Sequence, residues 1–276
     1  RMSLYNVIIR PFVKNMDRER ASKIALKYFA VIGKIPFGRA INRWIHDNRA
    51  KGLQKEVFGL SFYNPIGLGA GLDRYGELYN DLNNLGFSFV EVGPMDAHGI
   101  SRAIENIQKD PQDDILAVCI CKDYFNAFTL GYDFFDFFVL DIHDAQTCTD
   151  ILDSVLEARI AEQTYKPIIL KVPDTVTCSE LESLSDYCLI NNVDGMELRS
   201  IEHIRIVSRH CKNKLPIIAN CHIDTPEKAR EALIEGADLV EIRTGLLREG
   251  PGIVTQTLDY LLKTSRQQST TNGSTV

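Results

Sequence analysis

The sequence lacks the features that mark several classes of protein. No apolar run approaches the roughly 18 residues that cross a membrane, and the first residues lack the apolar core and cleavage site of a signal peptide. The 276 residues include only 18 Gly and 10 Pro, which excludes a collagen-like chain, and 45% are hydrophobic, which excludes a disordered one. At about 100 to 200 residues per domain, this length allows one large domain or two small ones.

The seven cysteines show no repeated Cys-x-x-Cys spacing. Their number is odd and most lie in apolar runs or expected helices, so we predict reduced thiols and a cytoplasmic protein. The side chains of Cys119 and Cys121 lie on the same face of one expected strand, but no further Cys or His pair nearby would complete the four ligands of a zinc site. We interpret both as small core residues and predict no metal site.

Positive charge is concentrated at the start of the chain. Residues 1–55 contain 13 Lys or Arg and three acidic residues, a net charge of +10, whereas the whole chain carries −6, which leaves −16 for the remainder. We expect a pair of short amphipathic helices here, the first between Asp17 and Gly33. The second has apolar residues at helical spacing: Phe37, Ala40, Ile41, Trp44 and Ile45. Such a hairpin suits an anionic membrane surface, at the inner face of the cell membrane, or packing against its own domain.

From residue 57 onward, short apolar runs alternate with helix patterns. We expect eight strands, over residues 64–69, 87–93, 115–121, 137–142, 167–172, 195–198, 216–221 and 239–244. Capped amphipathic stretches lie between several of them, over residues 149–163, 179–191, 201–212 and 226–235. The alternation predicts an α/β fold, a closed (β/α)8 TIM barrel, with a doubly wound open sheet as the alternative. The pattern is weakest over residues 94–114.

These patterns divide the chain into three expected parts. A basic helical extension covers residues 1–55, the barrel covers 56–264, and a polar, disordered tail covers 265–276.

In such a barrel, chemistry is expected where the strands end. The first expected strand ends in a glycine-rich run from Gly67 to Gly71, which lets a flat ligand approach the backbone, and Arg74 adds positive charge. A tight turn explains the run equally well. Lys171 ends another apolar strand and needs an anionic partner, either a bound cofactor or ligand, or an ion pair with Asp141 or Glu197.

Three further strand ends carry candidate residues. The turn with Cys221 and His222 and the turn with Arg243 and Thr244 occupy the phosphate-binding region of a (β/α)8 barrel. His222 contacts a ligand or lies on the surface. The fourth strand is followed by Asp141-Ile142-His143-Asp144, in which His143 between two carboxylates could act as a base with a raised pKa. A capping Asp beside a surface His is the alternative.

Several blocks of sequence resemble one enzyme family. VFGLSFYNPIGLGAGLDR at residues 57–74 and GFSFVEVG at 86–93 resemble the opening of the class 2, quinone-linked dihydroorotate dehydrogenases. Residues 168–174, 193–195 and 216–251 follow the order of that family, and residues 4–11 with the basic helical pair resemble its membrane-touching extension. The resemblance implies an FMN barrel that oxidises dihydroorotate to orotate in pyrimidine biosynthesis and passes electrons to a membrane quinone.

The resemblance also implies roles for individual residues. Flavin contacts fall on Ala70, Gly71, Lys171, Thr244 and Gly245, and the phosphate turn falls on Cys221 and His222, with Arg243 as an added donor. The serine base of the family falls on Asp144, with His143 as a second candidate base. Substrate-binding positions fall on Arg74, Asp141 and Gln146.

The departures from the family decide the functional hypothesis. The phosphate turn lacks its glycines, the substrate loop after Gly93 is absent, and Asp141 replaces an asparagine that reads orotate. Our leading hypothesis is a diverged homologue whose dihydroorotate oxidation is weakened or lost. The alternatives are an active FMN dehydrogenase acting on dihydroorotate or an altered substrate, and a non-catalytic barrel that binds a membrane or a partner. Expected partners are an orotate-type substrate and, through residues 1–55, quinone or an anionic membrane, with no nucleic acid.

Overall fold

The structure is a computed structural model that describes residues 52–111 and 114–272. Before residue 52 it describes only residues 11, 16, 20, 23–24, 27–28 and 30–31. Those that fall within the predicted first helix, from residue 20 to residue 31, are helical. The second predicted helix lies outside the described residues.

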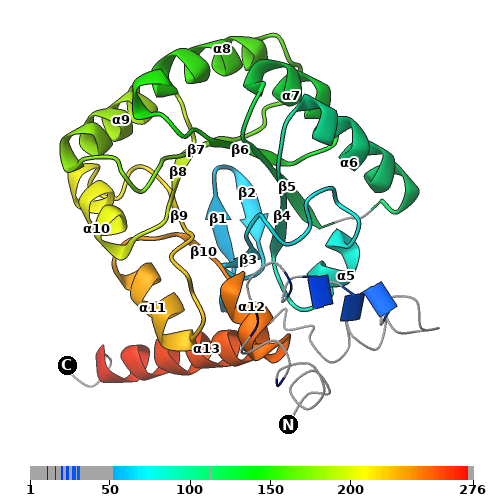
Figure 1. Ribbon diagram of the computed structural model, residues 1–276. Helices are drawn as coiled ribbons and strands as arrows, with labels where there is room; N and C mark the ends of the chain where they lie inside the picture. The colour runs from blue at the N-terminus through cyan, green and yellow to red at the C-terminus, as the bar shows by residue number, and fades with distance from the viewer. Residues whose placement is uncertain are drawn as a thin grey trace.

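Eight parallel strands close into a barrel with helices around it (Figure 1). The strands are β3 (Ile66–Leu68), β4 (Phe89–Met95), β5 (Ile115–Ile120), β6 (Phe137–Asp141), β7 (Ile168–Lys171), β8 (Gly195–Leu198), β9 (Ile217–Ala219) and β10 (Leu239–Glu241). Each lies within one of the eight predicted strands or overlaps it closely. Pairing of β10 with β3 completes the ring, with Val240 opposite Ile66. The closed barrel is therefore confirmed and the open-sheet alternative is excluded.

The barrel helices are α5 (Tyr79–Asn83), α6 (Ala97–Lys109), α7 (Tyr124–Gly131), α8 (Cys148–Ile160), α9 (Cys178–Ile190), α10 (Ile201–His210), α11 (Pro226–Ile234), α12 (Thr244–Glu249) and α13 (Gly252–Asn272), with a short 3-10 helix, η1 (Ala145–Thr147). Four of the barrel helices, α6, α9, α10 and α11, begin at a residue whose side chain caps the first turn. Thr177 and Glu180 form a capping box at the start of α9. Helix α6 fills most of the stretch with the weakest pattern, and its first turn is stabilised by the Asp96 carboxylate, which accepts from the Gly99 N–H.

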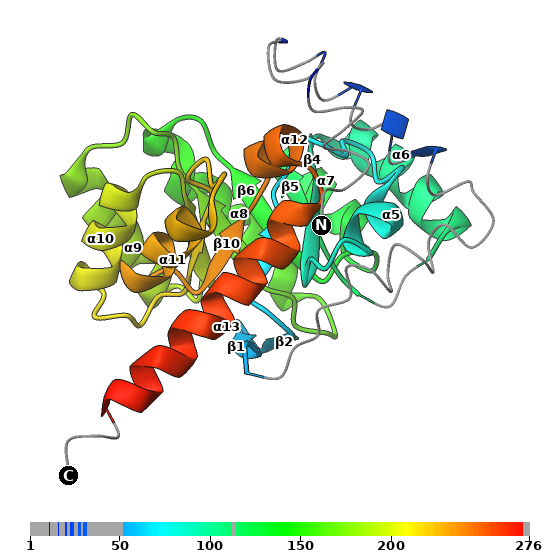
Figure 2. The same ribbon diagram turned by 90° about the horizontal axis from the view of Figure 1, so that it is seen from below.

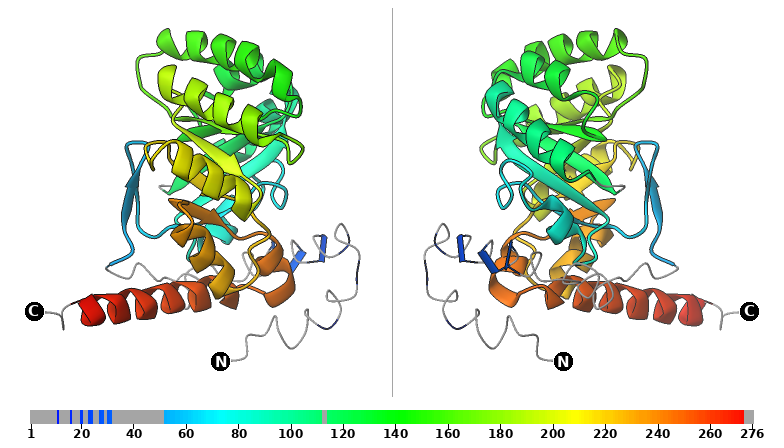
Figure 3. Two further views of the ribbon diagram at one scale, coloured as in Figure 1. Left: turned by 90° about the vertical axis from the view of Figure 1, so that its left-hand side faces the viewer. Right: turned by 90° about the vertical axis from the view of Figure 1, so that its right-hand side faces the viewer.

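A two-stranded hairpin, which was not predicted from the sequence, covers the amino end of the barrel. Strands β1 (Lys55–Val57) and β2 (Leu60–Phe62) are joined by Phe58 and Gly59, both with positive φ, which matches the twist of a tight hairpin. Phe62 packs edge-on against Phe89, and Phe58 packs against Phe137. Figure 3 shows the hairpin lying across one end of the barrel. Aromatic side chains thus fill the barrel at this end.

Toward the other end, the barrel interior changes from aromatic to acidic. Alternate strands of a (β/α)8 barrel contribute four inward side chains to one layer. Phe89 on β4 and Phe137 on β6 point inward, so the residues two positions later on these strands point inward as well. With their counterparts on β8 and β10 they form one layer, which contains Glu91, Val139, Glu197 and Glu241. Such layers are normally filled by branched apolar residues. Three buried glutamates here place unusual charge directly beneath the carboxyl ends of the strands.

Helix α13 ends the described chain. It runs from the side of α12 back toward the hairpin (Figure 2). The helix continues to Asn272, so the boundary expected at residue 264 falls inside a helix, while residues 273–276 lie outside the described residues. Neither α13 nor any other described helix is long and apolar enough to cross a membrane.

Candidate functional site

The carboxyl ends of the barrel strands open onto a cavity of about 280 Å³. This volume lies near the lower end of the ~300 to 1,000 Å³ usual for small-molecule sites. The lining residues come from the strand ends and the segments that follow them: Ala70, Pro94, Cys119, Asp141, Lys171, Asp174, Arg199, Asn220, His222 and Arg243. The cavity is therefore located where (β/α)8 barrels carry their sites.

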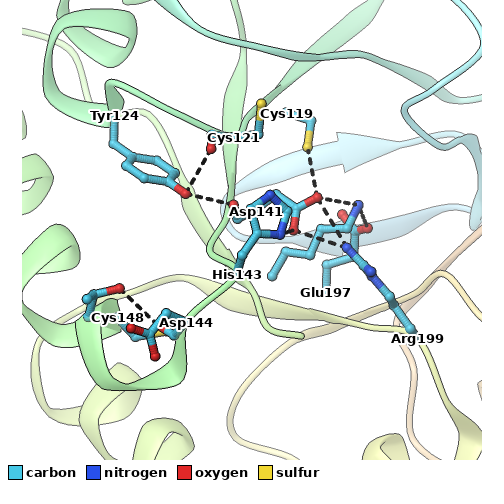
Figure 4. Close-up of polar contacts among 11 residues, drawn as sticks. Cys119, Cys121, Tyr124, Asp141, His143, Asp144, Cys148, Glu197 and Arg199 are labelled. Carbon is cyan, nitrogen blue, oxygen red and sulfur yellow. Dashed lines mark hydrogen bonds and ion pairs between the residues drawn. The ribbon is translucent and has the colours of Figure 1, made fainter. Parts of the chain in front are cut away.

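Asp141, at the end of β6, lies close to three basic side chains, those of Arg199, Lys171 and His143. The Nη2 atom of Arg199 lies 3.1 and 3.2 Å from the two carboxylate oxygens of Asp141. Lys171 Nζ and His143 Nδ1 each lie 3.9 Å from one of these oxygens. Figure 4 shows Asp141 between Cys119, His143 and Arg199. The negative charge of Asp141 is thus already balanced by groups of the chain itself.

Lys171 forms its closest ion pair with Glu197, on the neighbouring strand β8. The Nζ to Oε1 distance is 2.6 Å, and the Asn220 side-chain amide donates to the same oxygen at 2.8 Å. Burial alone lowers the pKa of Lys171, but the surrounding carboxylates, Glu197 foremost, raise it well above its usual value. The ion pair was one of the two readings left open by the sequence. Because it keeps Lys171 protonated, this side chain is no amine nucleophile at neutral pH.

Glu91 and Glu241 complete an acidic cluster with Glu197. Carboxylate oxygens of the three residues lie within 4.8 Å of one another. Burial, followed by the charge of Glu197, raises the pKa of Glu91 well above its usual value and that of Glu241 to about 8. Burial therefore favours the protonated forms of Glu91 and Glu241, whereas Lys171 lowers the pKa of Glu197 against the opposing effect of its burial.

Arg243 lies against the glycine-rich run that follows β3. Its Nη1 atom donates to the backbone oxygen of Ala70 at 2.7 Å. A Cβ atom on Gly71, which has φ +110°, would lie 2.6 Å from the same nitrogen. The guanidinium group therefore covers both backbone positions that were expected to contact a flavin.

The turn after β9 is filled by side chains and close backbone packing. Cys221 Sγ lies 3.5 Å from the backbone oxygen of Leu198, and His222 has a positive φ of 54° without being glycine. On the facing turn, a Cβ atom on Gly245 would lie 2.9 Å from the backbone oxygen of Ile223. Residues 221 and 222 therefore carry side chains where the resemblance implies glycines that let a phosphate approach the backbone.

The predicted bases lie outside the cavity. Asp144 is exposed, and its carboxylate accepts from the Gln146 N–H at 3.0 Å, which caps η1. The His143 side chain is 69% exposed, and its ring nitrogen reaches Asp141 only at 3.9 Å. Figure 4 shows Asp144 beside Cys148, away from the network around Asp141. This arrangement matches the alternative reading of a capping Asp next to a surface His.

The other predicted residues divide into two groups. Ala70, Asp141, Lys171, His222 and Arg243 line the cavity together. The remaining predicted residues are not among its lining residues: Arg74, Gly71, Gln146, Cys221, Thr244 and Gly245.

Two of these residues make contacts elsewhere. Arg74 is exposed, with its guanidinium carbon 5.6 Å from the centre of the Tyr75 ring. Gln146 donates to Glu180 at 3.2 Å on the exposed surface. Neither geometry supports a role in binding a ligand within the barrel.

The buried roles of Glu91 and Glu241 were not predicted from the sequence. Each is a single acidic residue at an alternate position within an apolar strand, between valine, leucine or isoleucine neighbours. In a strand buried on both faces, such a position points either into the barrel or toward the helices. A charged residue there was a signal for a polar barrel interior.

No protein-family model matches the chain. Curated relatives do match along most of it. The dihydroorotate dehydrogenase (quinone) of Actinobacillus succinogenes is 26% identical, with 90% of this chain and 96% of that protein covered. The enzyme of the same name from Yersinia pseudotuberculosis is 24% identical, with 94% of this chain and all of that protein covered. The first alignment spans 330 positions against 276 residues here, so the relative has segments without a counterpart in this chain.

Solved structures with the same fold include two of DHODH from Eimeria tenella. The complex with ferulenol has a TM-score of 0.75 at 18% identity, and covers 92% of this chain and 93% of that one. The ligand-free structure has a TM-score of 0.77 at 18% identity, with 91% of this chain and 96% of that one covered. These similarities support the barrel architecture.

Proposed function

We propose that this chain, which is a diverged member of the quinone-linked dihydroorotate dehydrogenase family, keeps the barrel of that family but no longer oxidises dihydroorotate. The observation that carries the proposal is the pairing of Arg199 with Asp141 inside the cavity. The resemblance implies substrate-reading amides around this place. Here a carboxylate and a guanidinium group neutralise each other, and neither reproduces the hydrogen bonds of an amide.

The residues present do not fit FMN in the mode that the resemblance implies. Arg243 covers the backbone of Ala70 and Gly71, and the Lys171 ammonium group is paired with Glu197. The expected phosphate turn carries the side chains of Cys221 and His222 in place of glycine. We therefore assign no flavin-dependent step to this site.

Loss of the substrate loop also weakens the binding of dihydroorotate. In place of the family loop after Gly93, the chain runs from Pro94 directly into α6. A typical hydrogen bond contributes about 1 kcal/mol, and every 1.4 kcal/mol is a factor of ten in an equilibrium constant. Absence of several amides therefore weakens dihydroorotate binding by orders of magnitude.

Residues 1–55 bear on where in the cell the protein is located. Their net charge of +10 supports peripheral attachment to an anionic membrane of a cytoplasmic protein, where quinone of the relatives' kind would be found. Co-sedimentation with vesicles that contain anionic lipid tests this part. Binding should disappear when residues 1–55 are deleted, and equal binding to neutral vesicles would contradict it.

The enzymatic part is tested on the purified full chain. We expect a colourless protein, no saturable uptake of added FMN, and no turnover of dihydroorotate with a quinone analogue. The Actinobacillus succinogenes relative, purified and assayed in parallel, serves as the positive control. A yellow protein whose dihydroorotate turnover is lost in Lys171→Ala would overturn the proposal.

A second measurement tests the assigned cause. The double variant Asp141→Asn/Arg199→Thr removes the ion pair and restores an amide at position 141. Because the flavin positions remain altered, we expect no turnover from this variant. Turnover appearing in it would show that the ion pair alone, rather than the cofactor site, had blocked the reaction.

A further inference from the structure

Three glutamates share one layer of the barrel interior. Glu91, Glu197 and Glu241 are contributed by β4, β8 and β10, and each is at most 1% exposed. Their carboxylate oxygens lie within 4.8 Å of one another. Strands far apart in the sequence thus direct three acidic groups to a single point on the barrel axis.

The cluster is short of positive partners. Lys171 and Asn220 both donate to one oxygen, Oε1 of Glu197. The other five oxygens of the three carboxylates receive no hydrogen bond from a described residue outside the cluster. Within the cluster, Glu91 lies within hydrogen-bonding reach of Glu197 and Glu241. Buried charges in proteins are paired or coordinate metals. Lys171 contacts Glu197 directly and balances one negative charge. When all three carboxylates are ionised, a divalent cation would balance the other two.

We propose that Glu91, Glu197 and Glu241 form a binding site for a divalent cation that prefers oxygen ligands, of the size of Ca²⁺ or Mn²⁺. Carboxylate oxygens are ligands of such ions. Calcium binds oxygen at about 2.3 to 2.6 Å, so two ligands on opposite sides of the ion lie about 4.6 to 5.2 Å apart. The observed spacing therefore allows coordination without moving the strands. The absence of sulfur and imidazole ligands from the cluster disfavours zinc.

The cavity lies next to the cluster, and a cation would enter from that side. Lys171 and Asn220, which contact Glu197, line the cavity, and the aromatic residues at the amino end close the opposite side. Gly69 permits the carboxylate of Glu241 to approach the backbone, since a Cβ atom there would lie 2.6 Å from Oε2. This path is independent of whether the chain oxidises dihydroorotate.

The test is calorimetric titration of the chelator-treated full chain with CaCl2 and, separately, MnCl2. We expect one ion per chain, and at least tenfold weaker binding in Glu241→Gln and in Glu91→Gln. Glu235→Gln is the matched control, since Glu235 is paired with Arg205 on the surface.

Thermal unfolding of the same proteins shows whether each variant is folded, so that a misfolded variant is not mistaken for one that has lost the binding site. The wild-type chain should melt at a higher temperature with the ion than without it, and this shift should be absent from a folded Glu241→Gln protein. Absence of binding to folded wild-type chain would overturn the proposal and leave protons as the only counter-charge. Unchanged binding in both folded glutamine variants would place the ion elsewhere and overturn it equally.

Discussion

Arg199 and Asp141 form an ion pair that joins the carboxyl ends of β8 and β6 across the cavity. One guanidinium nitrogen lies 3.1 and 3.2 Å from the two carboxylate oxygens, although the residues are 58 positions apart in the sequence. The Asp141 side chain is 8% exposed and that of Arg199 is 31% exposed. The pair therefore combines a buried anion with a partly solvated cation, and it occupies space that a ligand would otherwise use.

Removing the arginine should destabilise the fold. In Arg199→Ala, Asp141 loses its nearest donor and keeps Lys171 at 3.9 Å, so we expect the free energy of unfolding to fall by about 1 to 3 kcal/mol. Urea denaturation measures the change. Arg205→Ala is the control, because its surface pair with Glu235 should contribute no more than about 1 kcal/mol. Equal losses in both variants would contradict a structural role for the Arg199 pair.

The hairpin at the amino end should contribute substantially to stability. Phe62 is 1% exposed and packs against Phe89 and Phe137. Phe62→Ala removes a buried ring and leaves a cavity, so we expect a loss of about 3 to 5 kcal/mol in the free energy of unfolding. Phe125→Ala, at a site 49% exposed, should lose less than about 1 kcal/mol. A small loss at Phe62 would show that the hairpin adds little to the barrel.

Stability should fall as the pH rises through about 8. Burial raises the pKa of Glu241 from 4.5 to about 8, so the folded chain holds a proton there that the unfolded chain releases. This contribution is complete below pH 4.5 and is lost as the pH approaches and passes 8, with a slope of at most about 1.4 kcal/mol per pH unit for one proton. Urea denaturation of chelator-treated protein between pH 6 and 9 measures it.

Two variants separate this effect from other titrations. In Glu241→Gln the decline with pH should be smaller than in the wild-type chain. Glu235→Gln should leave it unchanged, because the hydrogen bond from Arg205 lowers the pKa of Glu235 below its ordinary 4.5, which places its titration outside the range from pH 6 to 9. A wild-type slope that persists in Glu241→Gln would assign the decline to other groups.

Asp144 should behave as a capping residue rather than a base. Its carboxylate accepts from the Gln146 N–H and is exposed to solvent. Asp144→Ala should reduce the free energy of unfolding by about 1 kcal/mol and leave cation binding in the barrel unchanged. The same variant gives a sharp contrary outcome, since dihydroorotate turnover that is present in the wild-type chain and absent from Asp144→Ala would make it the catalytic base.

The regular part of the fold was predictable because its signals are local. Each barrel strand is a short apolar run, and caps such as Thr177 mark where helices begin. The hairpin was missed because Phe58, an aromatic residue, occupies a positive φ that sequence patterns associate with Gly or Asn. Helix α6 was missed because Gly99 and His98 in its first turn weaken the helical pattern, although Asp96 caps it.

The candidate site was predictable only in part. The sequence placed Lys171 at a strand end and offered Glu197 as a partner, because a buried ammonium group needs an anion. Directions of side chains beyond the strands were not predictable, since loop geometry turns Asp144 toward η1 and out of the cavity. Arg243 was expected to hold a phosphate, yet it donates to the Ala70 backbone, a contact set by how β10 meets β3.

The sequence by itself determined the order of strands and helices, their caps and the polarity of each strand position, because these depend on neighbouring residues. Closure of the barrel decided the rest. Glu91, Glu197 and Glu241 are isolated acidic residues in the sequence, and only the ring formed by β3 to β10 directs them to one point. Because they are buried close to one another, the pKa of Glu91 and that of Glu241 are raised, and the three carboxylates need a counter-charge when they are ionised. This effect depends on proximity in space, so no local sequence pattern predicts it.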